Sequence, residues 1–285
     1  MAVSICTCRA KMESQKIPAH TVGSLIAGPR QAVIHGKSLG LVLPTNQVCE
    51  VVREATGHDK ALLSFSLGKD SWAAWLSARD YFDFTPYYLY LVPGLEFVQD
   101  YIGYAEQKLG KHIVQLPHPA FYRWINHATY QAPERLRTIV AVGWPDFEYD
   151  DIREAVIEDC GLPQDVWTAT GVRAADSPMR RASLIKNQGV NAKRQYFYPC
   201  WDWKKEQLLA ELVRADIKLP IDYKVFGRSF DGLDLRFLIK IKEHFPRDYQ
   251  TILDWFPLVD MEIARYEFAK RQGTARLAGE RHRSV

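Results

Sequence analysis

Residues 61–117 alternate between short apolar runs and amphipathic stretches, and this alternation is the feature that most constrains the fold. The apolar runs cover residues 61–66, 87–92 and 112–117. Between them, residues 70–82 and 96–109 carry their apolar side chains at helical spacing, and Gly110 ends the second stretch. Elements of these lengths in this order predict strand–helix–strand units, whose strands pair in parallel. We therefore expect an α/β fold with a parallel sheet flanked by helices.

The rest of the chain extends this pattern and then changes it. Further strands are predicted at residues 166–172 and 195–200, which brings the count to about five, and helices at 47–55 and 203–215, the latter with Asp202 as its N-cap. After Pro220 only helices are predicted, at 233–245 and 249–271, with breaks at Pro246 and Pro257. We divide the chain into a lead-in (1–50), an α/β domain (51–225) and a helical C-terminal subdomain (226–285).

Composition excludes several classes of protein. The 285 residues are 47% hydrophobic with a formal net charge of +3, which is typical of a folded globular chain and too small a charge for nucleic-acid binding over the whole surface. No run approaches the roughly 20 apolar residues of a membrane helix. The N-terminal apolar run precedes its positive charges, unlike a secretory signal, so we expect a cytoplasmic protein. The five cysteines, Cys6 and Cys8 among them, are predicted to be reduced thiols.

The most informative segment is Ser-Phe-Ser-Leu-Gly-Lys-Asp-Ser, residues 64–71, at the junction of the first predicted strand and its helix. Amides at a helix N-terminus lack intrahelical partners, and the helix dipole is positive there, so a polyphosphate is a natural ligand. A glycine lets the backbone approach the ligand closely, hydroxyls donate, and a lysine neutralises phosphate charge. Asp70 either caps the helix or helps to hold Mg²⁺. The predicted nucleotide-binding residues here are Ser64, Ser66, Leu67, Gly68, Lys69, Asp70 and Ser71.

This segment does not match the G-x-x-x-x-G-K-[ST] loop, because Asp70 stands at the Ser/Thr position. It resembles the S-G-G-x-D-S signature of the PP-loop ATP pyrophosphatases, in the branch similar to phosphoadenosine phosphosulfate (PAPS) reductase. Three later segments agree in order, over residues 55–225. Residues 92–98 are similar to a Gly-Leu-Glu-Phe-like turn, 171–180 to G-I-R-x-x-E-S-x-x-R, and 198–203 to Y-P-[IL]-x-D-W. Short members of this kind are familiar from bacteriophages.

The resemblance implies an adenine nucleotide alpha hydrolase-like fold and an enzyme that binds ATP with Mg²⁺. It implies cleavage between the α and β phosphates, adenylyl transfer to a small anionic acceptor such as a sulfur-pathway oxyanion, and release of pyrophosphate. Lys69 would balance charge on the pyrophosphate, and Arg173 and Arg180 would clamp the α-phosphate or the acceptor. Gly94 and Gly171 would border the nucleotide, and Asp70 would contact the metal.

Two departures from the family pattern leave alternatives open. Leu67 replaces the first glycine of the signature, so a positive φ there would strain the loop. No cysteine follows Cys200, which disfavours sulfonucleotide reduction unless a partner subunit supplies the thiol. The chain could instead be a non-catalytic nucleotide-binding or assembly module, whose basic tail (265–285) contacts nucleic acid. In the plainest interpretation, the loop is only a helix cap and the arginines form surface ion pairs.

Overall fold

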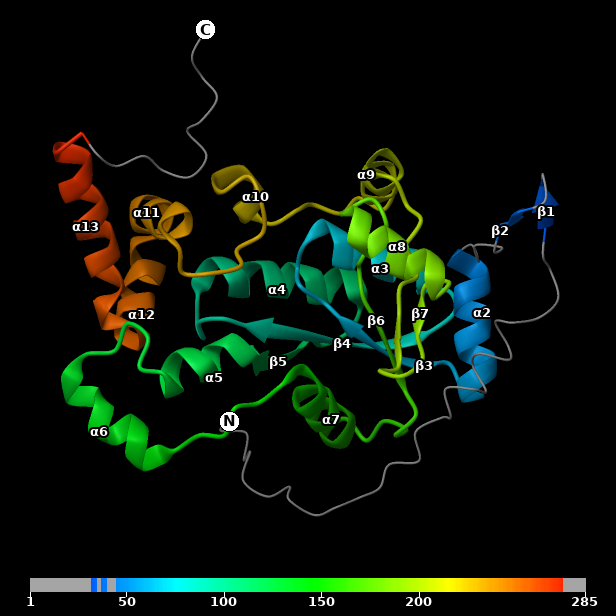
Figure 1. Ribbon diagram of the computed structural model, residues 1–285, viewed down its shortest axis with the longest axis horizontal. Helices are drawn as coiled ribbons and strands as arrows, with labels where there is room; N and C mark the ends of the chain where they lie inside the picture. Colours follow the sequence, from blue (N-terminus) through cyan, green and yellow to red (C-terminus); the bar gives the residue numbers. More distant parts are fainter. Residues whose placement is uncertain (1–31, 35–36, 40–44, 274–285) are drawn as a thin grey trace, which may run out of the picture.

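The computed structural model describes residues 32–34, 37–39 and 45–273 (Figure 1). Two short strands, β1 (Ala32–Ile34) and β2 (Lys37–Leu39), form an antiparallel pair of their own. Helix α2 (Thr45–Thr56) then leads into the main sheet, where a helix was predicted. Cys6, Cys8 and most of the predicted lead-in lie outside the described residues.

The main sheet has six strands in the order β5-β4-β3-β6-β8-β7. Five are parallel, as predicted: β3 (Lys60–Ser64), β4 (Asp83–Tyr90), β5 (Val114–Pro117), β6 (Trp167–Ala169) and β8 (Tyr196–Phe197). The short β7 (Val190–Asn191) pairs antiparallel with β8 at the edge. From the central β3 the chain runs outward through β4 to β5, and then returns to the other side of β3 through β6. This is a doubly wound order, and its direction switches between β3 and β6.

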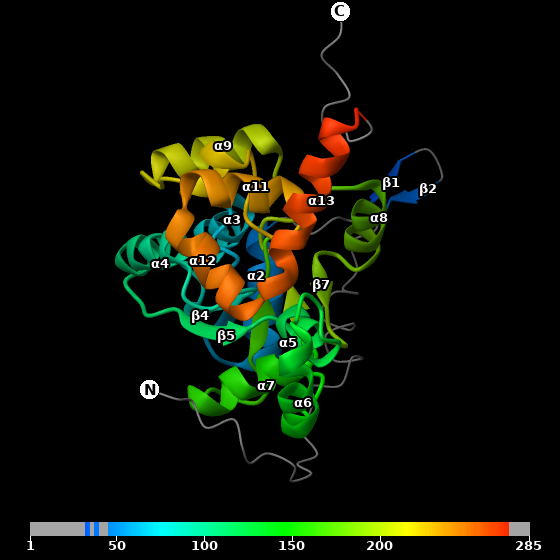
Figure 2. The same cartoon turned by 90° about the vertical axis from the view of Figure 1, so that its left-hand side faces the viewer.

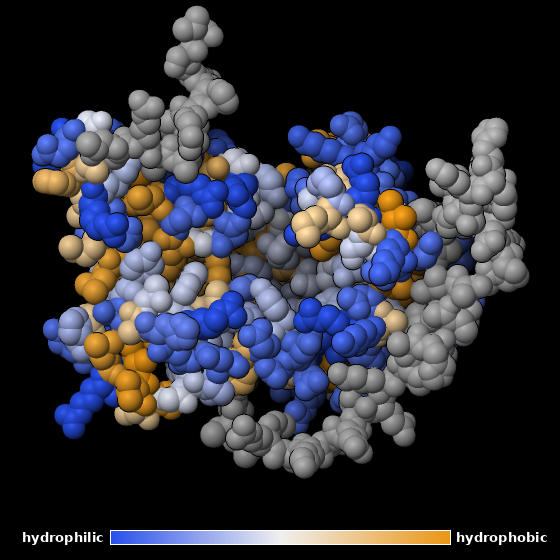
Figure 3. All heavy atoms as spheres, viewed as in Figure 1, coloured by the Kyte–Doolittle hydropathy of each residue, from blue (hydrophilic) through white to orange (hydrophobic). Residues whose placement is uncertain are grey.

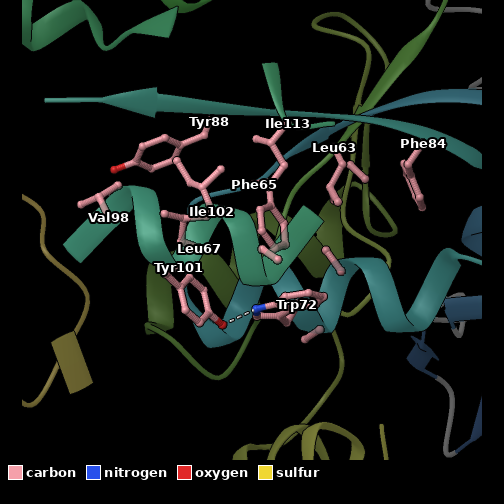
Figure 4. Packing of buried hydrophobic residues seen from close by; sticks show 14 of the residues in the cluster. Leu63, Phe65, Leu67, Trp72, Phe84, Tyr88, Val98, Tyr101, Ile102 and Ile113 are labelled. Carbon is pink, nitrogen blue, oxygen red and sulfur yellow. Dashed lines mark hydrogen bonds between the residues drawn. The ribbon is translucent and has the colours of Figure 1, made fainter. Parts of the chain in front are cut away.

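Helices cover both faces of the sheet, and the side chains of β3 alternate between them. Leu63 belongs to the large apolar core on the face covered by α3 (Lys69–Ala78) and α4 (Glu96–Leu109) (Figure 4). Its neighbour Leu62 belongs to a second cluster, under α7 (Tyr149–Asp159), on the opposite face in Figure 1. Because successive strand residues point to opposite faces, a continuous apolar run is what a strand buried on both faces requires.

The C-terminal part is helical, as predicted: α9 (Lys205–Arg214), α10 (Ile221–Val225), α11 (Leu235–His244), α12 (Pro246–Trp255), the 3-10 turn η1 (Pro257–Val259) and α13 (Asp260–Arg271). Figure 2 shows α12 next to α4, and α11 packs against both α12 and α13. Phe237 and Ile252 belong to the same apolar core as Leu63, so these helices pack onto the sheet domain. Asp248 of α12 accepts hydrogen bonds from the amides of Glu96 and Phe97, which caps α4.

Some elements differ from the sequence prediction. The expected N-cap at Asp202 is wrong, because α9 begins at Lys205 and its N-cap is Lys204. The sequence prediction also missed α5 (Pro119–Asn126), α6 (Pro133–Val142), α7 and α8 (Pro178–Lys186). Helix α6 has no buried residue and exposes apolar side chains such as Val140. Figure 3 shows an orange region at the lower left, where α6 lies in Figure 1. Among the described residues, no helix has the length and apolar character needed to cross a membrane.

Candidate functional site

The connections that follow β3 and β6 meet at the carboxyl edge of the sheet. Residues 65–68 join β3 to α3, and residues 170–177 join β6 to α8. These strands are neighbours and parallel, so both connections leave the same edge. In doubly wound sheets, ligands bind in the crevice outside the carboxyl ends of the strands, at the point where the strand order reverses. We therefore place the candidate site there, and call it the crevice.

The first connection presents backbone amides at the start of α3. Its N-cap is Gly68, which has no side-chain cap, and the Ser71 hydroxyl donates to the Gly68 carbonyl at 2.8 Å. The amide of Lys69 donates to the hydroxyl of Tyr223, 3.2 Å away. The α3 N-terminus is therefore not capped by its own side chains, as an anion-binding helix start requires.

Leu67, which replaces the first glycine of the signature, adopts the left-handed conformation. Its φ is +63°, in the region that favours glycine, while its side chain is buried in the core on the α4 side, where Figure 4 shows it near Ile102. The conformation costs about 1–2 kcal/mol for a residue with a Cβ, and burial of a leucine side chain contributes a similar amount or more. The loop therefore keeps its turn without the glycine of the family signature.

Gly171 lets the second connection lie directly against the first. A Cβ atom at this position would stand 2.1 Å from the carbonyl oxygen of Asp70 and 2.9 Å from the amide nitrogen of Ser71. Both atoms belong to the backbone, so neither can swing aside. A side chain at residue 171 would push the two connections apart, which gives this glycine a packing role in the site.

A chain of ion pairs links the two connections. Lys69 Nζ lies 2.7 Å from Asp70 Oδ2, and Asp70 Oδ1 lies 3.0 Å from Nε of Arg173. Asp176 then bridges Arg173 and Arg180, with both nitrogen–oxygen distances at 3.1 Å. The three predicted cationic residues thus meet in one network, held by two aspartates.

Arg173 is buried in this network and has donors left over. Its side chain is only 6% exposed, and Nη1 has no hydrogen-bond partner among the described residues. Nε and Asp70 Oδ1 are at ion-pair distance but are not aligned for a hydrogen bond. The buried hydroxyl of Thr170, in the same connection, also lacks a partner in the described part of the chain. Orphaned buried donors cost free energy, so their presence together in the crevice indicates a place for an anionic ligand.

The remaining predicted residues take different positions. Ser64 ends β3, Ser66 is exposed on the turn, and the exposed Gly94 follows β4 with a φ of +80°. The helix after Gly94 is already capped by Asp248, so its amides are engaged. Because β4 runs parallel to β3, Gly94 lies at the same edge of the sheet as the loop. The role predicted for Gly94 beside the nucleotide stays a prediction.

The carboxylates of the crevice fit a Mg²⁺ ion bound mainly by phosphates and water. Such an ion needs only one or two protein carboxylates, and Asp70 and Asp176 are the ones in the ion-pair network. Asp70 Oδ1 is buried and accepts no hydrogen bond from the described residues. No group of three or more acidic, histidine or cysteine side chains that could hold a metal occurs within residues 47–273.

Other chemistry-bearing residues have structural roles. Burial raises the pKa of the Cys200 thiol, which makes it a poor nucleophile. His118 caps α5 by accepting a hydrogen bond from the Ala120 amide, and burial lowers its pKa. Trp201 and Trp203 are buried and belong to the apolar core.

A cavity of about 540 Å³ lies at the opposite edge of the sheet, beside the first residues of β3 and β4. Arg79 and Lys111 are among its basic lining residues, and both already pair with carboxylates, Asp80 and Asp83 respectively. It lies away from the strand ends where doubly wound sheets bind ligands.

Sequence reasoning missed two residues of the crevice. Tyr223 of α10 and Ser229, which follows it, reach the loop from more than 150 positions along the chain. No local pattern in the sequence marks them, because their place depends on how the C-terminal helices pack.

Comparison with known proteins adds little at this level of similarity. No protein-family model and no curated protein matches the chain. Among solved structures, the chain is similar to an NH3-dependent NAD synthetase from Campylobacter jejuni in complex with a nitrate ion. The match has 13% identity and a TM-score of 0.37, and it covers 83% of this chain and 97% of that one. A similarity this weak does not bear on function.

Proposed function

We propose that the chain is an ATP-utilising enzyme of the PP-loop type that binds the nucleotide phosphates in the crevice. Two features that meet where the strand order switches carry this proposal. The N-cap residue of α3 makes no side-chain capping hydrogen bond, and the buried Arg173 has donors without a partner in the described part of the chain. Both features favour an anion of high charge density. The motifs resembling those of PAPS reductase-like proteins support an adenine nucleotide as that anion.

The finer proposal is adenylyl transfer. An oxygen of an oxyanion acceptor attacks the α-phosphorus, the bond from that phosphorus to the oxygen bridging to the β-phosphate breaks, and pyrophosphate leaves with the electron pair. No nucleophile from the protein is needed. Mg²⁺, when bound with the nucleotide at Asp70, would neutralise phosphate charge.

The side chains of this site are largely positioned in advance. Asp70 and Asp176 hold the Arg173 guanidinium, so little side-chain entropy is lost when its free Nη1 meets a phosphate oxygen. Lys69 is 25% exposed and can reach the departing pyrophosphate. Arg180 is 55% exposed at the rim, where it can meet an anionic acceptor. The arrangement therefore separates a fixed cation from two adjustable ones.

The proposal is tested by incubating the protein with ATP labelled at the α-phosphate, Mg²⁺ and candidate oxyanions. Lys69→Ala should lower pyrophosphate release by about 10²–10³-fold, the usual effect of removing one group that stabilises developing charge. Lys108→Ala is the matched control, because this lysine of α4 pairs with Asp216, away from the crevice. Equal activity in Lys69→Ala and wild type would exclude the loop as the phosphate site.

A non-catalytic nucleotide-binding module is the second candidate, favoured by the strained Leu67 and by the hydroxyls that cover the loop. The same assay separates the two: nucleotide binding without any product, with every acceptor tried, would favour the module. PAPS reduction with a thiol from a partner subunit would instead release sulfite only when a second protein is added. Binding of nucleic acid by the basic tail stays a prediction, because residues 274–285 lie outside the described residues.

A further inference from the structure

Two hydroxyl groups from the C-terminal part of the chain lie on the phosphate-binding face of the loop. The Tyr223 hydroxyl accepts a hydrogen bond from the Lys69 amide at 3.2 Å, and the Ser229 hydroxyl donates to it at 3.1 Å. A Cβ atom on Gly68 would stand 2.8 Å from the Ser229 oxygen and 3.3 Å from the Tyr223 oxygen. Both oxygens therefore cover the glycine that permits close approach to the backbone.

An oxygen within hydrogen-bond distance of an amide at the helix start is what a bound phosphate would supply. The Lys69 amide has a single proton, and a phosphate oxygen placed on it has to replace the hydroxyl of Tyr223. We infer that Tyr223 and Ser229 occupy the positions of phosphate oxygens over the loop, and that a polyphosphate must displace both hydroxyls to bind. This inference rests on the proposed function and identifies residues that set the affinity of the same site.

The displacement involves side chains and leaves the backbone of this segment in place. Phe226 lies between the two hydroxyl-bearing residues in sequence and Phe230 follows Ser229. Both rings pack against Phe97 of α4, with centroids 6.1 and 5.8 Å from that of Phe97. Moving the segment as a whole would break this aromatic cluster, whereas rotating the side chains of Tyr223 and Ser229 leaves it intact. Side-chain rotation is fast, so the two hydroxyls act as a competitor of the ligand and not as a slow lid.

The test measures the affinity for inorganic pyrophosphate by calorimetry with the full chain. Tyr223→Phe removes the competing hydroxyl and should bind pyrophosphate about two- to tenfold more tightly, the range that one hydrogen bond contributes. Tyr104→Phe is the matched control. Its hydroxyl accepts a hydrogen bond from the backbone amide of Lys218, at 2.8 Å, but it does not touch the loop. Its affinity should equal that of the wild type.

Hydrogen exchange at the Lys69 amide provides a readout without ligand, and it should be faster in Tyr223→Phe than in the wild type or Tyr104→Phe. Weaker pyrophosphate binding in Tyr223→Phe would show that the hydroxyl contacts the ligand, and unchanged binding would show that it does not compete. Either result would overturn the inference. If binding weakens in Lys69→Ala but is unaffected by Tyr223→Phe, only this inference fails. If no protein in the series binds pyrophosphate, the proposed function fails together with it.

Discussion

Replacing Gly171 with alanine tests the contact that joins the two halves of the crevice. The added Cβ would meet the Asp70 carbonyl oxygen at 2.1 Å, and ordinary contact begins at 3.4 Å, so the connections must separate by about 1.3 Å. Because the opposing atoms are backbone, we expect the cost to reach the upper end of the overpacking range, about 3 kcal/mol. A misplacement of about 1 Å costs on the order of 10²-fold in catalysis, so activity should fall more than stability alone explains.

Urea unfolding would measure the loss of stability, and release of pyrophosphate from ATP would measure the loss of activity. Gly103→Ala is the matched control, because this glycine lies inside α4 and a Cβ there would meet no atom within 4 Å. In a helix that change should stabilise the protein by roughly 0.5–1 kcal/mol, since alanine has the higher helix propensity. A Gly171→Ala protein with wild-type stability and wild-type activity would refute the close approach of the two connections.

Two further predictions concern the loop and a helix cap. Leu67→Gly should be about 1 kcal/mol more stable than Leu67→Ala, the reverse of the usual order, because both lose the buried side chain but only glycine relieves the left-handed φ; urea unfolding decides it. His118 caps α5 through a neutral ring nitrogen, and burial lowers its pKa in the folded chain. As the pH falls, the imidazole is therefore protonated at a higher pH in the unfolded chain than in the folded one. Wild type should therefore lose stability as the pH falls from 7 to 5, whereas His118→Asn, which keeps a cap that does not titrate, should not; equal losses would contradict this.

The sequence predicted the parts of the fold that local periodicity encodes. The apolar runs and helical spacings before residue 117 correspond to β3, α3, β4, α4 and β5, and Gly110 ends α4 in the left-handed conformation. The position of the loop was predictable, because a glycine and polar residues commonly mark the turn between a strand and a helix. For Leu67 the sequence indicated only that a positive φ, if the loop needed one, would cause strain, and the φ of +63° meets that condition.

The parts that the sequence did not reveal depend on tertiary packing. Helix α6 carries Leu136, Ile139 and Val140 at helical spacing but has no buried residue, and the sequence prediction did not assign it. Asp202 is a good N-cap by residue type, but it ends the turn that precedes the helix, and α9 starts three residues later, at Lys205. The contact of Tyr223 with Lys69 joins residues whose proximity only the packed C-terminal helices determine.

The central claim is that the amides at the start of α3 bind the phosphates of a nucleotide. Amide NMR spectra of the protein, recorded during titration with pyrophosphate, test it most directly. The account predicts the largest shifts at Gly68, Lys69 and Ser71. Shifts confined to Arg53 and Arg79, which line the cavity at the other edge of the sheet, would contradict it.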